Sequence, residues 1–300
     1  MDGTRVRHAA KLYRSALENR AYLELARLLA DRVLRGHGVP RGDGRAVLLL
    51  PGYLAGDRSL SLLARFLRRI GYLPVFSGIA FNSGCAGSYE RRIIDAVRHA
   101  RQSTGQPIAV VGHSRGGHYA KSIAAARPGD VSHVVCLGSG LDAVLDVYPV
   151  TALSAAVSRR GLALAGSARQ ASGCLTEWCS CSLQASYRQP FPGGPHLTSI
   201  YTRSDGVVRW ESCLADYATC VEVPGSHIGL AFNRHAYRAI AQALTTAPDR
   251  RGEHHYLTVP KGPVPDCAPP WLTSSRQTRG RRTRWSSDLL DGTKVSRAPA

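Results

Sequence analysis

Short apolar runs alternate with segments of helical period along much of the chain, and this alternation constrains the fold more than any other feature. Ala46–Leu50, Ile108–Val111 and Val131–Leu137 are brief, mostly apolar and bounded by turn formers, which is typical of strands buried on both faces. Between them, apolar residues recur every three or four positions, as on the buried face of a helix. Strands that alternate with helices of about 10–15 residues predict βαβ units. We therefore expect an α/β protein with a doubly wound, mainly parallel sheet.

The same pattern suggests how the chain is organised. Residues 1–44 have a helical leucine period that ends in a Gly/Pro cluster, so we predict an N-terminal helical segment. Residues 45–248 carry the alternation, interrupted at about 143–197 by a Ser-, Ala-, Gly- and Pro-rich stretch that is too long for an ordinary connection. We expect this stretch to be an inserted cap. Its candidate pocket-wall residues are Leu175, Trp178 and Phe191. Residues 249–300 are polar, basic and without apolar period, which predicts a disordered tail.

The strand at Ile108–Val111 runs directly into Gly112–Gly116, which reads GHSRG, and then into a helix. G-x-S-x-G between a strand and a helix is typical of a nucleophile elbow, a sharp turn that exposes a serine hydroxyl above the sheet. The glycines let neighbouring backbone approach without a Cβ clash. We therefore predict that Ser114 is a nucleophile. His113 and His118 are expected to face away from it.

A serine nucleophile needs a base, and the base needs a carboxylate that orients it. Asp205 follows the predicted strand at 199–202, and His227 follows the one at 220–223. The order Ser, Asp, His, with each residue beyond a strand, is the order expected after such an elbow. We predict Asp205 and His227 as acid and base. Asp142, which follows an earlier strand, is the alternative acid.

An oxyanion hole needs two donors. The first is expected to be the backbone N–H of Arg115, the residue after the nucleophile. The second should come from the loop after the first strand, where Gly52 permits a twisted backbone. The N–H of Tyr53 is our candidate, with that of Leu54 as the alternative.

These motifs resemble the α/β-hydrolase superfamily, and most closely a bacterial lipase/esterase-like group. That group carries P-G-[FY]-L-A after the first strand, S-x-x-D-G-[IV]-V at the acid and G-S-H-x-G-L at the histidine. The corresponding segments here are Pro51–Ala55, Ser204–Val208 preceded by Arg203, and Gly225–Leu230. The likeness covers about residues 45–245. It implies the α/β-hydrolase fold, a triad of Ser114, Asp205 and His227, and hydrolysis of carboxylic esters.

From these features we expect a serine ester hydrolase that acts on a small-molecule or lipid ester and uses no cofactor. A thioesterase or an acyltransferase would use the same machinery, because only the acceptor differs, and a catalytically silent basic binding protein is a further alternative. Arg115 stands where many members of the group have an apolar residue. Since it places a cation beside the nucleophile, both neutral and anionic substrates stay open.

The chain has a net charge of +18, but 35 of its 39 basic residues are arginines spread over the whole length. Such a distribution indicates no specific nucleic-acid site, although the Arg-rich segments 1–35 and 58–70 suggest weak association with anionic membrane surfaces. No apolar run approaches the ~20 residues of a membrane span. The N-terminus also lacks the apolar core of a signal peptide. We therefore predict a cytoplasmic protein.

The chain has eight cysteines, which is unusual for that compartment. Cys174, Cys179 and Cys181 depart from the paired spacing of a zinc site, so no metal is predicted. Cys213 and Cys220 could close a short disulfide loop in an oxidising milieu.

Overall fold

The computed structural model describes residues 17–143, 146–164 and 181–246. Within them, six strands form one parallel sheet in the order β2-β1-β3-β4-β5-β6. The strands are β1 (Ala46–Leu50), β2 (Leu73–Phe76), β3 (Ile108–His113), β4 (Val131–Leu137), β5 (His196–Tyr201) and β6 (Thr219–Glu222). The α-helices of the described residues are α2 (Ala21–Ala30), α3 (Ser61–Arg69), α4 (Ala86–Thr104), α5 (Arg115–Ala126), α6 (Pro149–Leu164), α7 (Ser182–Tyr187) and α8 (Arg234–Ala243). The predicted doubly wound parallel sheet is confirmed.

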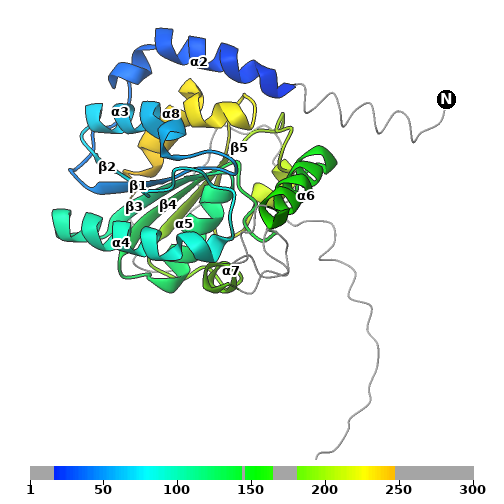
Figure 1. The fold of residues 1–300 in the computed structure, drawn as a ribbon. Coiled ribbons are helices and arrows are strands. Elements are labelled where there is room, and N and C mark those ends of the chain that lie inside the picture. The colour runs from blue at the N-terminus through cyan, green and yellow to red at the C-terminus, as the bar shows by residue number, and fades with distance from the viewer. Residues whose placement is uncertain (1–16, 144–145, 165–180, 247–300) are drawn as a thin grey trace, which may run out of the picture. The chain divides into compact units, whose positions relative to one another are not determined.

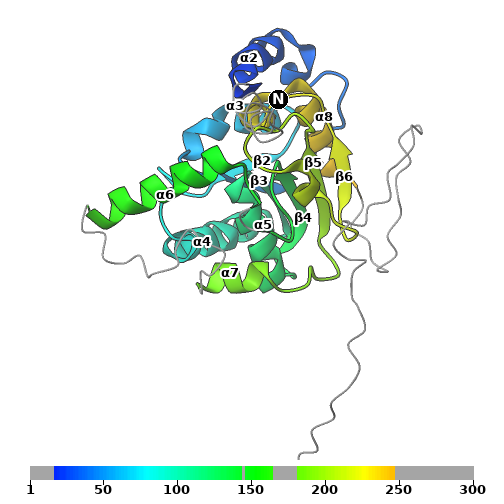
Figure 2. The same cartoon turned by 90° about the vertical axis from the view of Figure 1, so that its right-hand side faces the viewer.

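Helices cover both faces of the sheet (Figures 1 and 2). α3 and α8 lie on one face, where Val47 and Leu49 of β1 join their core. α4, α5 and α7 lie on the other face, where Leu48 and Leu50 join a second core. Because β1 lies inside the sheet with helices on both faces, it is apolar and buried at every position.

The strand order places a switch point between β1 and β3. The chain leaves β1 toward β2 on one side and returns to β3 on the other, so the loops after β1 and β3 diverge at their carboxyl ends. Open parallel sheets bind ligands in the crevice at such a point. The loop after β1 contains Gly52 and Tyr53, and Ser114 follows β3 directly. Topology alone therefore brings the candidate nucleophile close to the candidate oxyanion donor.

The N-terminal helical segment is packed into the domain. Its described part consists of η1 (Leu17–Arg20), α2 and η2 (Arg32–Arg35). Leu28, Val33 and Leu34 are buried in the same core as α3 and α8. This part of the segment therefore shares a core with the sheet; residues 1–16 lie outside the described residues.

The predicted cap contributes two described helices with different positions. α6 lies apart from the two layers, whereas α7 packs beside α5 and α4 in the layer on the second face (Figure 2). Of the candidate wall residues, Leu175 and Trp178 lie outside the described residues. Phe191 stacks on Tyr217, with ring centroids 5.8 Å apart.

The remaining expectations for the chain are tested only in part. The tail at 249–300 and two of the three clustered cysteines lie outside the described residues. Cys213 is a buried thiol, so the disulfide considered for it is not formed. Among the described residues, no helix combines the length and the apolar character needed to cross a bilayer, and no three His, Cys, Asp or Glu side chains are grouped as metal ligands would be.

Candidate active site

The elbow at Ser114 is strained in the way that its sequence predicts. Ser114 has a φ of 51°, and among the described residues the only other non-glycine with positive φ is Leu54, at 58°. Both residues line the same cavity. A Cβ on Gly112 would lie 2.3 Å from the carbonyl carbon of Gly116, and a Cβ on Gly116 would lie 2.1 Å from the carbonyl oxygen of Leu50. The turn therefore requires glycine at both positions.

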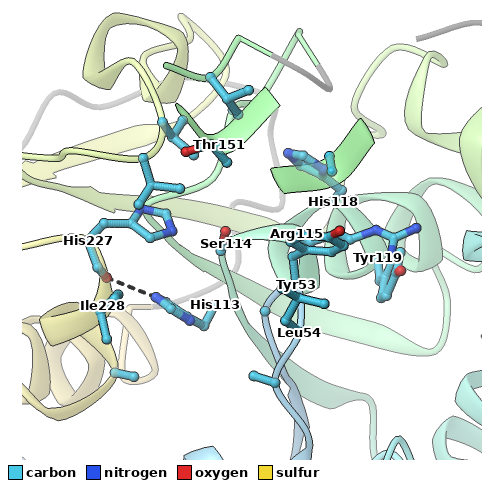
Figure 3. Close-up of a pocket in the computed structure, with 18 of the residues that line it drawn as sticks. Tyr53, Leu54, His113, Ser114, Arg115, His118, Tyr119, Thr151, His227 and Ile228 are labelled. Atoms are coloured by element: carbon cyan, nitrogen blue, oxygen red, sulfur yellow. Dashed lines mark hydrogen bonds between the residues drawn. The ribbon is translucent and has the colours of Figure 1, made fainter. Parts of the chain in front are cut away.

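His227 and Asp205 form a buried pair at the same cavity. The His227 Nδ1–H donates to Asp205 Oδ2 over 2.6 Å. The other carboxylate oxygen, Oδ1, accepts from the backbone N–H groups of Val207 and Val208 at 2.8 and 2.7 Å, which fixes the orientation of the acid. With Nδ1 occupied, Nε2 of the imidazole is left for the nucleophile. Figure 3 shows the His227 ring beside the Ser114 hydroxyl.

The pKa of His227 is raised above its usual value although the ring is buried. Burial alone lowers this pKa, but the negative charge of Asp205 and its hydrogen bond raise it, and the charge of Glu18 adds to the same effect. A base of raised pKa accepts a proton from a hydroxyl more readily.

The alternative acid, Asp142, has other partners. Its carboxylate lies 3.1 Å from Lys121 Nζ and accepts a hydrogen bond from the Tyr217 hydroxyl. Asp142 is thus held by a lysine and a tyrosine, while Asp205 holds the histidine.

The two residues predicted to supply the oxyanion donors, Tyr53 and Arg115, both line the cavity of Ser114. Among the described residues, the N–H groups of Tyr53 and Arg115 have no hydrogen-bond acceptor. The N–H of Leu54, the alternative donor, is occupied, because it donates to the carbonyl of Asn82 over 3.0 Å. The geometry therefore leaves the N–H groups of Tyr53 and Arg115 for an oxyanion.

Several observations together decide the fold. The parallel sheet has a switch point, a strained serine follows β3, and an aspartate and a histidine lie beyond β5 and β6. This is the α/β-hydrolase fold. No family model matches the sequence, and no curated protein matches it significantly.

Solved structures resemble the chain at low identity. A metagenome-derived lipolytic enzyme, from a report on LipS and LipT, has 16% identity and a TM-score of 0.48 over 68% of this chain and 93% of its own. A soluble variant of monoglyceride lipase from Saccharomyces cerevisiae has 13% identity and a TM-score of 0.47 over 69% and 89%. The thioesterase domain from the curacin biosynthetic pathway has 18% identity and a TM-score of 0.42 over 68% and 92%. At these values, the substrates of those proteins say nothing about the substrate of this hydrolase-fold chain.

Asn82 holds the loop after β1, a contact that the sequence did not predict. This buried side chain donates to the carbonyl of Pro51 over 2.9 Å. Its Oδ1 accepts from the Tyr119 hydroxyl at 2.9 Å and from the Arg115 guanidinium at 3.1 Å. The guanidinium also donates to the carbonyl of Gly84 over 2.7 Å. The Arg115 side chain is therefore fixed beside the cavity.

Two buried glutamates from the N-terminal segment hold the loops of Asp205 and His227, and they were also missed. Glu18 accepts from the backbone N–H groups of Gly206, His227 and Ile228 at 2.9, 3.1 and 2.8 Å. Glu24 accepts from the N–H of Ser226 at 2.8 Å. Glu18 thus links the loop of the acid to the loop of the histidine. In the sequence both residues look like the polar positions of an amphipathic helix, so no local signal distinguishes them.

His113 and His118, which were expected to face away from Ser114, both line its cavity. His113 Nε2–H donates to the backbone oxygen of His227 over 2.9 Å (Figure 3). Burial, then the nearby His227, lower the pKa of His113 to about 4. Burial, then the charges of Arg115 and Lys121, lower the pKa of His118 to about 3. Both imidazoles are therefore neutral near pH 7.

The cavity above Ser114 has a volume of about 480 Å³. Its lining includes apolar side chains from loops around the site, among them Val147, Val207 and Ile228, and a polar group made of Tyr53, His118, Arg115 and Gln184. α6 contributes Thr151, Ser154 and Ala155. Phe191 is not among the lining residues; the predicted cap reaches the cavity through α6, α7 and the residues Ala143, Asp146 and Val147 before α6.

Proposed function

We propose that this protein is a serine hydrolase that cleaves carboxylic esters through an acyl-enzyme on Ser114. The observation that carries the proposal is the convergence on one cavity of a serine in a strained elbow and a histidine held by a buried aspartate. A histidine paired in this way is suited to activate a neighbouring hydroxyl.

The reaction would run in two halves. Ser114 Oγ attacks the ester carbonyl carbon while its proton passes to His227 Nε2, and the oxyanion is stabilised by the N–H groups of Tyr53 and Arg115. His227 then gives that proton to the leaving alcohol oxygen. In the second half, water loses a proton to His227 and attacks the acyl carbon. Ser114 recovers its proton as the acid is released. Asp205 keeps the imidazole in the productive tautomer throughout.

The test is active-site labelling combined with turnover. A fluorophosphonate probe should label the wild type at one residue, and Ser114→Ala should lose both the label and the hydrolysis of 4-nitrophenyl acetate, by about a thousandfold or more. Ser103→Ala, which alters an exposed serine of α4, is the matched control and should behave as wild type. Undiminished labelling of Ser114→Ala would overturn the proposal and favour a silent binding protein.

The same preparation distinguishes the alternative acyl-transfer reactions. Thioester analogues of the same acyl groups should be hydrolysed more slowly than the oxygen esters. Transfer of the acyl group to an added alcohol should be slower than its transfer to water. A preference for thioesters, or for transfer to the added alcohol over transfer to water, would replace ester hydrolysis with thioesterase or acyltransferase activity.

A further inference from the structure

All the buried side-chain polar atoms without a hydrogen-bond partner in the described part of the chain belong to one place. They are the Tyr53 hydroxyl, Nε2 of His118 and Nε2 of Gln184. All three residues line the cavity of Ser114. Buried polar groups in proteins are nearly always paired. Three unpaired polar atoms on one wall of one cavity therefore indicate that a polar group of the ligand completes their hydrogen bonds.

The chemistry of these atoms defines the group that would pair them. The Gln184 amide nitrogen can only donate, and the Tyr53 hydroxyl and one nitrogen of neutral His118 can donate as well. The Arg115 guanidinium adds positive charge to the same wall. Its acceptors, Asn82 Oδ1 and the Gly84 carbonyl, are neutral, and no carboxylate forms an ion pair with it among the described residues. Several donors beside an uncompensated cation suit an anionic acceptor, and a carboxylate is the simplest of these.

The position of this wall assigns the carboxylate to one end of the substrate. His227 must deliver its proton to the leaving oxygen, so the alcohol part of the ester lies on the side of His227. Figure 3 shows Tyr53, Arg115 and His118 across Ser114 from His227. Gln184 joins this wall from α7, which packs on α5 and places the ring of Tyr187 5.1 Å from that of His118. The donors therefore face the acyl part of the substrate.

We propose that the preferred substrates are esters of dicarboxylic acids, or of acids with a comparable anionic end, whose free carboxylate binds to Tyr53, His118, Gln184 and Arg115. This inference rests on the proposed function, since it names the acyl group that the same site would accept. In the sequence, Arg115 leaves open whether the substrate is neutral or anionic, and this inference favours an anionic substrate.

The test compares two esters with the same five-carbon chain. Mono-4-nitrophenyl glutarate ends in a carboxylate, and 4-nitrophenyl pentanoate ends in a methyl group. The wild type should favour the glutarate in kcat/KM by about tenfold to a hundredfold, the range expected for hydrogen bonds to a charged group. Gln184→Leu should reduce this ratio by about tenfold. Gln189→Leu, at an exposed position just beyond α7, should leave the ratio unchanged.

A binding measurement separates this inference from the proposed function. Glutarate and pentanoate are titrated calorimetrically into Ser114→Ala, with and without Gln184→Leu. Tighter binding of glutarate that Gln184→Leu weakens supports the carboxylate site even if no ester is hydrolysed. Ser114-dependent hydrolysis of the pentanoate ester without any preference for glutarate, in rate or in binding, would overturn the inference and leave the ester hydrolase standing.

Discussion

Both carboxylate oxygens of Asp205 are occupied before a substrate binds, one by His227 and the other by two backbone N–H groups. An asparagine at this position would keep the shape but could turn its amide toward the imidazole and impose the wrong tautomer. We expect Asp205→Asn to lower kcat on 4-nitrophenyl acetate by a factor on the order of 10⁴, the loss that follows when the triad acid of a serine protease is replaced by asparagine. Asp142→Asn should change kcat little. The reverse ranking, measured on folded variants, would show that the earlier strand carries the acid.

Glu18 supports the histidine through the backbone and through its charge. In the proposed mechanism His227 acts as a base and must be neutral, so kcat/KM should fall as the pH drops through the pKa of His227. Because the negative charge of Glu18 raises that pKa, Glu18→Gln should move the acid limb of the pH profile to lower pH and reduce kcat. Glu222→Gln removes the same charge at an exposed site and should not move the limb. If the role of Glu18 is only structural, Glu18→Gln will lower the stability of the protein and leave the midpoint of the acid limb in place.

The contrast between these residues shows what sequence can predict of such a site. That Ser114, Asp205 and His227 lie together could be predicted, because each follows a strand within a local motif and the fold brings the ends of parallel strands together. Glu18 carries no motif and meets Gly206 and His227 across 188 and 209 positions of chain. Contacts of that range depend on how the N-terminal segment packs, which no local pattern encodes.

At the scale of elements, the strands were predictable and the cap only in outline. The strands are short apolar runs between turn formers, and the order of motifs predicted which strand ends carry the candidate site. The segment between β4 and β5 lacks a clear period, so its division into α6 near the cavity and α7 in the helical layer was not predicted. Phe191 was placed at the cavity because of its apolar character alone, but it packs on Tyr217.

The cavity wall formed by α6 gives a prediction about substrate size. Ala155 lines the cavity, whereas Ala152 is exposed on the same helix. Ala155→Leu adds bulk to the wall and should reduce kcat/KM for 4-nitrophenyl octanoate by about tenfold, with a smaller effect on the acetate. Ala152→Leu should leave both esters unchanged. Equal losses on both esters would show that α6 supports the site without shaping the space for the substrate.

At the scale of the whole molecule, charge and compartment are separate from the fold. Three expectations stay predictions: weak association with anionic membrane surfaces, a cytoplasmic location and the absence of a specific nucleic-acid partner. The structure bears instead on how the N-terminal segment belongs to the domain. Residues 17–35 supply both core leucines and the glutamates that hold the loops of the acid and the histidine.

Two adjacent leucines of α2 test this integration. Leu28 is fully buried against the core of the sheet, and Leu29 is 54% exposed. Leu28→Ala should lower the free energy of unfolding by roughly 2–5 kcal/mol, because it removes buried methyl groups and leaves a cavity. Leu29→Ala should change it by no more than about 0.5 kcal/mol. Urea unfolding followed by fluorescence and by loss of ester hydrolysis provides the measurement. If the segment is part of one cooperative unit, both signals of Leu28→Ala shift together to lower urea. Loss of activity at a urea concentration where fluorescence stays native would mean that the segment unfolds on its own.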